Sequence, residues 1–101
     1  MIVNRQIWVV REEHTIEEAM ELFKGYPPDA PQATRVLSPI SLIHQESIAT
    51  LIFEFEYDSL AAMLEQWSKL SEVPGWRPFM EKWRAVCERN SQKSDVWRVV
   101  Q

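Results

Sequence analysis

The sequence predicts an α+β fold in which strands and helices follow one another in the order β-α-β-β-α-β. Three observations carry this prediction. Four segments are rich in β-branched and aromatic residues, which favour strands. Two other regions repeat apolar residues every three or four positions, which is typical of helices. Polar or proline-containing stretches separate these segments, so each can be assigned to its own element.

The first strand is predicted over residues 2–11, IVNRQIWVVR, where both parities carry apolar residues. A strand that is apolar on both sides is expected to be covered on both sides. A helix follows from Thr15, because Thr15 and Glu18 form a capping box that satisfies free amides at a helix start. The helix is expected to end near Gly25, since glycine commonly terminates helices.

The middle of the chain is predicted to hold a loop and two strands. Residues 26–32, YPPDAPQ, contain three of the six prolines and are expected to form the loop. The strands are predicted over residues 33–44, with Pro39 at a bulge or edge because it has no amide hydrogen, and over residues 48–57. The apolar face of the later strand carries Ala49, Leu51, Phe53, Phe55 and Tyr57, and its mixed face carries Ile48, Thr50, Ile52, Glu54 and Glu56.

A second helical region begins after Asp58 or Ser59, either of which can cap a helix. The stretch SEVPG at residues 71–75 interrupts it, and a second helical piece is predicted over residues 76–88. A last strand is predicted over residues 95–101, DVWRVVQ. The second helical piece has an apolar stripe that is expected to pack against the apolar strand face: Trp76, Phe79, Met80, Trp83 and Cys87.

No internal repeat or linker interrupts the chain, so residues 1–101 are predicted to form one domain. The element order is that of a ferredoxin-like unit, a four-stranded antiparallel sheet with both helices on one face. The other face would carry Thr50, Ile52 and one parity of the first strand, containing either Trp8 or Ile7. Soluble monomers rarely expose such an apolar face, so a second copy is expected to cover it in a twofold-symmetric homodimer.

Composition argues against several classes of partner. Eleven basic and fifteen acidic residues give a net charge of −4, which argues against nucleic acid because its binding rests on phosphate neutralisation. No basic run indicates an anionic membrane surface, and no stretch approaches the roughly 20 apolar residues of a membrane span. The start of the chain lacks the features of a signal peptide, so a cytoplasmic location is expected. The single cysteine, Cys87, excludes an intrachain disulfide.

Three ionisable residues are the candidates for catalysis. Glu54 and Glu56 are two positions apart on one strand and therefore point to the same side. In an enclosed space they could shuttle protons, whereas at an open rim they would be solvated or paired with Arg98 or Arg35. His44 ends a predicted strand, where it is either a base or haem ligand in a cavity or a solvent-facing turn residue.

Four residues are candidates for binding a ligand between two sheets, namely Trp8, Thr50, Ile52 and Arg98. The guanidinium of Arg98 could hold a substrate carboxylate. No histidine spacing fixes a metal, and a chain with only two glycines has no phosphate-binding loop. No metal and no cofactor are therefore predicted.

The run IATLIFEFEYDSLAAMLEQWSKLSEVPGWRPFMEKW resembles the NIPSNAP-like branch of the dimeric α/β-barrel superfamily. The features are a hydrophobic strand ending in an aromatic residue, Asp-Ser-Leu opening a helix, and a Pro-Gly-Trp element before a second aromatic-rich segment. The start, RQIWVVREEHTIEEAMELF, is similar to that family's first strand and helix. The resemblance implies a barrel formed by the two sheets of a dimer. In the wider superfamily, some members cleave or oxidise small organic molecules in the cavity and others bind haem.

Three functions stay open on this basis. The first is a small homodimeric NIPSNAP-like protein that binds a hydrophobic or aromatic molecule between its two sheets. The second is a cofactor-independent monooxygenase or isomerase that uses cavity carboxylates or a histidine. The third is a structural or interaction module with a closed dimer core. Whether the protein is an enzyme is not decided by its sequence, because fold alone does not carry function.

Overall fold

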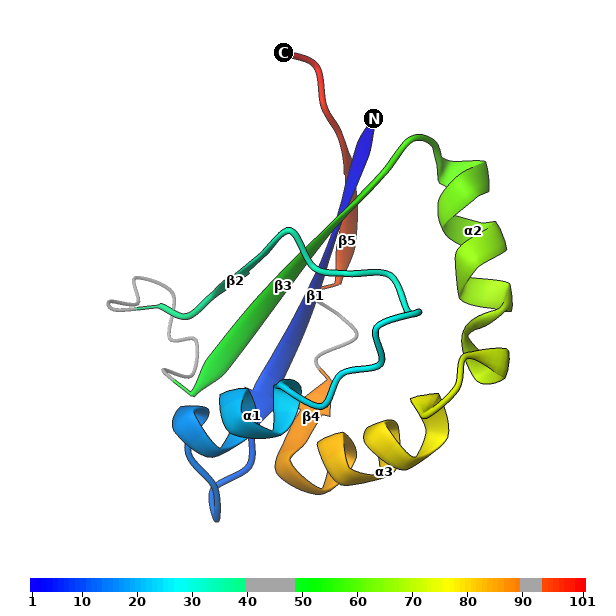
Figure 1. The fold of residues 1–101 in the computed structure, drawn as a ribbon. Helices are drawn as coiled ribbons and strands as arrows, with labels where there is room; N and C mark the ends of the chain where they lie inside the picture. Colours follow the sequence, from blue (N-terminus) through cyan, green and yellow to red (C-terminus); the bar gives the residue numbers. More distant parts are fainter. Residues whose placement is uncertain (40–48, 90–93) are drawn as a thin grey trace.

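The computed structural model describes residues 1–39, 49–89 and 94–101. It confirms the α+β prediction, with helices packed against an antiparallel sheet (Figure 1). The strands are β1 (Ile2–Val10), β2 (Arg35–Leu37), β3 (Thr50–Tyr57), β4 (Cys87–Arg89) and β5 (Asp95–Arg98). The helices are α1 (Ile16–Phe23), α2 (Leu60–Ser68) and α3 (Trp76–Val86), with a short 3₁₀ helix η1 (Leu70–Glu72) between α2 and α3.

Local capping signals place the helix starts where they were expected. Thr15 Oγ1 accepts a hydrogen bond from the amide of Glu18 at 3.1 Å. Ser59 Oγ accepts one from the amide of Ala62 at the same distance, 3.1 Å. The predicted capping box is only half formed, because the carboxylate of Glu18 lies 2.7 Å from His14 Nδ1. The starts of α1 and α2 thus each have one free amide satisfied by a side chain, whereas the start of α3 at Gly75 has no side-chain cap.

The second helical region is broken, as predicted, by η1 and Gly75. Gly75 has a φ of 81°, in the left-handed region that glycine adopts without a steric penalty. The chain turns here, and α2 and α3 run at an angle to each other around the sheet (Figure 1). α3 ends at Val86, earlier than predicted, because Cys87 already pairs with Val10 of β1.

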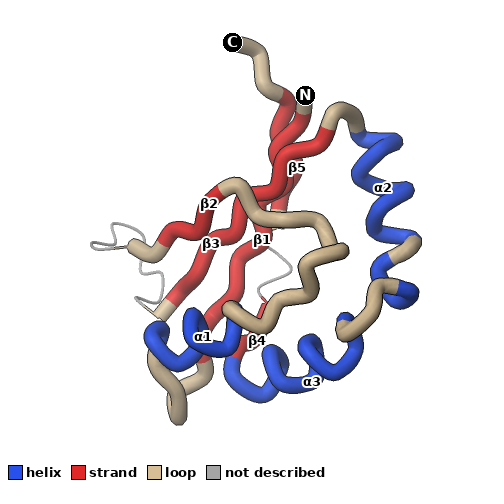
Figure 2. The backbone as a smooth tube through the Cα atoms, in the orientation of Figure 1, coloured by secondary structure: helices blue, strands red, loops and turns tan. Residues whose placement is uncertain are grey.

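The sheet has five strands among the described residues, where four were predicted. Its order is β2-β3-β1-β4, and β5 also pairs with β1 (Figure 2). The last part of the chain forms two strands because its register against β1 shifts: Trp8 lies opposite Arg89, but Arg5 lies opposite Asp95. Two residues of β1, 6 and 7, separate the two registers, whereas five residues, 90–94, separate β4 from β5. The unequal spacing prevents one continuous ladder.

The helices cover one face of the sheet. The apolar residues that alternate along β3 are buried on this face, as predicted: Leu51, Phe53, Phe55 and Tyr57. The even-numbered residues of β1, including Trp8 and Val10, belong to the same core. The odd-numbered residues of β1, including Ile7, therefore point to the other side of the sheet. We call that side the open face, since no helix of the described residues lies over it.

Candidate functional site

A cavity of about 520 Å³ lies between the helices and the sheet. Gln6 and Trp8 of β1 form its floor together with Phe53 and Phe55 of β3. A volume of this size falls within the range of small-molecule sites, roughly 300–1,000 Å³. We call it the helix-side cavity. It lies across the sheet from the space in which the sequence predicted a ligand.

Aromatic side chains form most of the walls of the helix-side cavity. α3 contributes Trp76, Phe79 and Trp83, which share one side of the helix because they recur every three or four residues. Trp67 of α2 lines the same space from beyond the turn at Gly75. α2 and α3 run at an angle to each other (Figure 1), and side chains from both helices line the cavity.

Contacts between rings hold the cavity wall in place, with Trp83 at their centre. Its ring lies edge-on to Trp8 at 6.0 Å and to Phe53 at 5.7 Å between ring centroids. It stacks on Phe79 at 5.9 Å, and Phe23 of α1 lies 4.9 Å from Phe53. Aromatic pairs in these geometries add attraction beyond the area that they bury. The cavity is therefore expected to be preformed and stiff.

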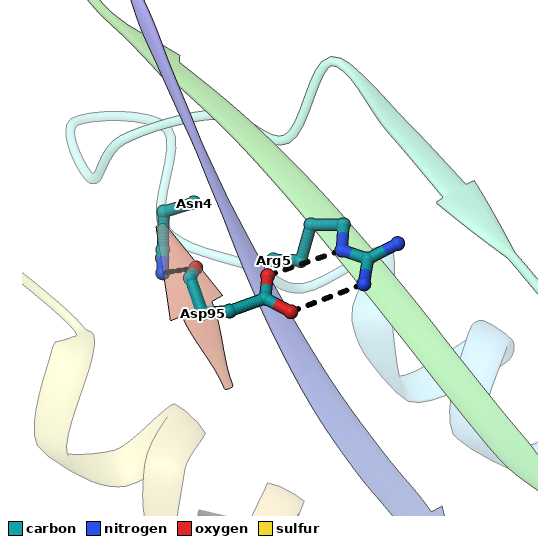
Figure 3. Close-up of polar contacts among 3 residues, drawn as sticks. All are labelled: Asn4, Arg5 and Asp95. Atoms are coloured by element: carbon teal, nitrogen blue, oxygen red, sulfur yellow. Dashed lines mark hydrogen bonds and ion pairs between the residues drawn. The ribbon is translucent and has the colours of Figure 1, made fainter. Parts of the chain in front are cut away.

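The side-chain amide of Gln6 lies in this aromatic floor and is hydrogen-bonded. Gln6 Nε2 donates to Asn4 Oδ1 at 3.1 Å, and Asn4 Nδ2 donates to the carbonyl of Asp95 at 2.9 Å (Figure 3). Asn4 is 2% exposed. Burial of an amide is unfavourable unless hydrogen bonds replace those lost from water. The hydrogen bond to Asn4, which is itself bound to β5, thus allows Gln6 to line a mainly apolar surface.

Charged side chains lie at one end of the helix-side cavity. Arg11 Nε donates to the carbonyl of Arg84 at 3.0 Å, and Arg11 Nη1 is 3.9 Å from Glu88 Oε2. All three side chains are exposed. An exposed ion pair of this kind contributes little to stability. These residues mark the end of the cavity that faces solvent.

Cys87 is a buried thiol in the cavity wall. Burial raises its pKa to about 11, although the nearby Arg11 acts in the opposite direction. Only the thiolate attacks a disulfide reagent, and a thiol with such a pKa is about 0.1% ionised at pH 8. We expect Ellman's reagent to modify Cys87 at least ~100-fold more slowly than free cysteine at pH 8, with a rate that rises up to pH 11. Denatured protein is the control, and equal rates for native protein and free cysteine would contradict the buried position.

The open face carries a row of four alternating charges. Across the sheet, Arg35 of β2 lies opposite Glu54 of β3, Glu54 opposite Arg5 of β1, and Arg5 opposite Asp95 of β5. Arg35 Nε donates to Glu54 Oε1, and Arg5 makes two parallel bonds to Asp95, Nε–Oδ1 at 3.1 Å and Nη2–Oδ2 at 3.0 Å (Figure 3). The hydrogen bonds to these carboxylates raise the pKa of Arg5 and of Arg35. We call these four residues the charge row.

The predicted catalytic residues do not meet in the helix-side cavity. Glu54 and Glu56 both border a more open hollow on the open face. Glu54 is buried and pairs with Arg35, one of its two predicted partners. The other predicted partner, Arg98, lies on the opposite side of the sheet by its register with β1. His44 lies outside the described residues.

The predicted ligand-binding residues are divided between the two faces of the sheet. Thr50 and Ile52 lie on the open face, whereas Trp8 lies in the floor of the helix-side cavity. Arg98 is in β5, away from the cavity lining. Gln6 was not predicted as a site residue. The available signal was its polarity at a position of β1 whose parity is otherwise mostly apolar.

In residues 1–39, 49–89 and 94–101, no group of three or more His, Cys, Asp or Glu side chains could hold a metal ion. None of the helices there is both long enough and apolar enough to cross a membrane.

Comparison with solved structures places the fold. A NIPSNAP domain protein from Burkholderia xenovorans superposes with a TM-score of 0.81 over 99% of this chain and 95% of its own, at 13% sequence identity. The fold is NIPSNAP-like. A NIPSNAP family protein from Agrobacterium tumefaciens strain C58 has a TM-score of 0.69 over 94% of this chain and 87% of its own, at 19% identity. Another Agrobacterium tumefaciens protein has a TM-score of 0.76 over 100% and 95%, at 14% identity.

No family model and no curated protein matches this sequence. The structural likeness at such low identity therefore concerns the NIPSNAP-like fold and carries no activity with it.

Proposed function

We propose that the protein binds a small aromatic or otherwise apolar molecule in the helix-side cavity. The observation that carries this proposal is the volume of about 520 Å³ lined mainly by aromatic side chains. Rings in the lining meet one another edge-on and stacked, so a flat apolar ligand would find the same kinds of contact. The ligand site is then inside one subunit, and it does not lie between two sheets.

The geometry favours binding over the enzymatic alternative. Glu54 and Glu56 lie across the sheet from the helix-side cavity, and Glu54 is engaged by Arg35. Within the lining, Cys87 is held protonated by burial at neutral pH. Burial also raises the pKa of Tyr26, whose hydroxyl donates to the carbonyl of Pro31 at 2.6 Å. Cys87 and Tyr26 therefore stay protonated near neutral pH, which suits residues that line the cavity and does not suit residues that transfer protons.

We expect indole and naphthalene derivatives to bind the native protein and to shift the side-chain N–H resonances of the cavity tryptophans. Met80→Trp replaces a flexible thioether by a bulky ring at a partly buried position of the lining and should weaken binding at least ~10-fold, because the added volume occupies the ligand's space. Nuclear magnetic resonance titration of both proteins measures the effect.

The matched control is Leu64→Trp, since Leu64 is 52% exposed on α2 and does not line the cavity. This variant should bind as the unmodified protein does. Absence of any shift in the unmodified protein would contradict the binding function and favour a closed structural module. Chemical conversion of the added compound would favour the enzymatic alternative.

We further propose that two copies associate through their open faces, as the dimeric α/β-barrel resemblance implies. Leu37, Ile52 and Ile7 form an apolar row across β2, β3 and β1, in which Leu37 is 38% exposed, Ile52 is partly exposed and Ile7 is buried. Trp97 of β5 is 55% exposed on the same face. Soluble monomers seldom expose an apolar patch of this kind. A second open face would cover it in a twofold-symmetric dimer.

The charge row supports this assembly. Its signs alternate from Arg35 through Glu54 and Arg5 to Asp95. A twofold axis parallel to the strands reverses the order of the row, so each cation of one copy would face an anion of the other. Such electrostatic complementarity favours one arrangement over its like-charged alternatives. A dimer with one domain per subunit, located in the cytoplasm, is the assembly that we propose.

A further inference from the structure

The helix-covered side of β1 contains two neighbouring amides, Asn4 and Gln6, in a region of large apolar side chains. Their partners across β3 are Phe55 and Phe53. Asn4 is 2% exposed, and Gln6 is half-buried and lines the helix-side cavity. Buried amides in such surroundings are unfavourable unless each polar atom has a defined role. The hydrogen bonds of this pair determine what Gln6 offers to a ligand.

A series of hydrogen bonds orients both amides, because each atom in it can only donate or only accept. The backbone carbonyl of Asp95 can only accept, so the amide nitrogen of Asn4 must face it, and the two atoms are 2.9 Å apart. Asn4 Oδ1 is then turned toward Gln6, and it can only accept. Gln6 must therefore present Nε2, which lies 3.1 Å from Asn4 Oδ1. Nitrogen and oxygen have similar shapes in a side-chain amide, but here the network assigns both.

The residue that supplies the first acceptor of this hydrogen-bond series, Asp95, is itself held in place. Asp95 is bound by the two parallel hydrogen bonds from Arg5, at 3.1 and 3.0 Å (Figure 3). Bidentate pairs between arginine and a carboxylate impose a definite geometry. β5 is also paired with β1 over four residues, from Ile2 to Arg5. The carbonyl that orients Asn4 thus belongs to a strand fixed by its backbone and by a side-chain ion pair.

Because Nε2 of Gln6 is bound to Asn4, Oε1 is the amide atom that Gln6 has left to offer to a ligand in the cavity that it lines. Acceptors are otherwise scarce among the aromatic walls. The hydroxyl of Tyr26 donates to Pro31, and the carboxylate of Glu88 lies at the exposed end beside Arg11. The amide oxygen of Gln6 is a strong acceptor with two lone pairs, set among rings that bind flat apolar surfaces.

We propose that Gln6 Oε1 accepts a hydrogen bond from the ligand, so that the helix-side cavity selects aromatic molecules that carry an N–H or O–H donor. Indoles and phenols are the chemical classes that meet this requirement. The inference rests on the proposed function of the cavity and specifies its ligand. A polar group placed to pair with a ligand donor also rejects an analogue that lacks the donor, because the acceptor is then left without a partner.

Indole and benzofuran provide the test, since they have nearly the same shape but benzofuran has a ring oxygen in place of the N–H. The unmodified protein should bind indole about three- to tenfold more tightly than benzofuran, the ratio expected for one hydrogen bond between neutral groups. In Gln6→Leu the ratio should fall to about one, with benzofuran bound at least as well as before. Protein-observed magnetic resonance titrations give the four dissociation constants.

Met80→Leu is the matched control, because Met80 also lines the cavity but has no amide. It should keep the preference for indole. A double variant, Asn4→Leu with Gln6→Leu, removes both amides together and serves where Gln6→Leu alone does not fold. In that variant too, the ratio should be about one.

The outcomes separate this inference from the binding function. If both compounds bind the unmodified protein equally, or benzofuran binds better, the cavity binds ligands but Gln6 does not select donors. If neither compound binds, both the function and the inference are overturned. A preference for indole that persists in Gln6→Leu also overturns the role of Gln6, whereas its loss there and its retention in Met80→Leu support it.

Discussion

Trp83→Ala is expected to lower the free energy of unfolding by about 3–5 kcal/mol, as large-to-small changes of buried aromatic residues do. Trp83 is 3% exposed and contacts Trp8, Phe53 and Phe79 through its ring. Removing it deletes these contacts and leaves a void that the stiff neighbours cannot fill. Since domains are stable by only about 5–15 kcal/mol, the loss is a large share of the total. Urea denaturation followed by circular dichroism measures it.

Two further variants make the result specific to Trp83. Trp83→Phe keeps a ring in place and should cost about 1–2 kcal/mol, because less area and fewer contacts are lost. Leu64→Ala changes an exposed residue of α2 and should stay within about 0.5 kcal/mol of the unmodified protein. A change below 1 kcal/mol in Trp83→Ala would show that Trp83 is not at the centre of the core.

Ile52→Lys is expected to convert the proposed homodimer into monomers. Ile52 lies on the open face opposite Ile7 and Leu37, and it is only partly buried within one chain. A lysine can therefore reach solvent in the monomer, but in the dimer its charge would be desolvated among apolar side chains. We estimate a cost of about 3 kcal/mol, which raises the dissociation constant roughly 100-fold. Analytical ultracentrifugation over a concentration series measures the dissociation constant.

The control for this substitution is Leu64→Lys, which adds the same charge on the exposed side of α2. It should leave the association unchanged. Circular dichroism should show that both variants keep their helix and strand content. A monomeric unmodified protein at micromolar concentration would overturn the dimer. An unaltered dimer in Ile52→Lys would place the interface on another surface.

The elements with local signals were predicted with nearly their observed bounds. Thr15 and Ser59 mark helix starts because their side chains accept hydrogen bonds from amides only three residues away. Gly75 marks the break because its backbone requires a left-handed conformation. The alternation of apolar residues along β3 predicted its buried face, because successive side chains of any single strand point to opposite sides.

The features that depend on distant pairing were not predictable in the same way. The extra strand β4 covers residues 87–89, where the end of a helix was predicted, and it pairs with β1 in a different register from β5. The sequence also does not decide which side of β1 faces the helices, because Trp8 and Ile7 are both apolar and either side is compatible with burial. Their assignment results from the packing of Trp8 on Trp83, 75 residues further along the chain.

The candidate site likewise combines features that local sequence predicts with features that depend on distant contacts. The helical spacing predicts the aromatic stripe on α3 and its packing against the apolar face of the sheet, but spacing alone does not reveal how much room two elements leave. The structure shows that these residues line a cavity between the helices and the sheet. Glu54 was correctly placed beside Glu56, yet its pairing with Arg35 required the register of β2 against β3.

Sequence by itself thus determined the order of the elements apart from β4, the starts of the helices and the buried face of β3. Each of these rests on the local pattern of one element, whereas the NIPSNAP-like fold was predicted from the resemblance of longer runs of sequence. Only the tertiary structure decided which side of β1 is covered, where the cavity lies and how Gln6 is oriented. The physical reason is that these features arise from contacts between β1, α3 and β5, and the sequence pattern of each element is compatible with more than one such arrangement.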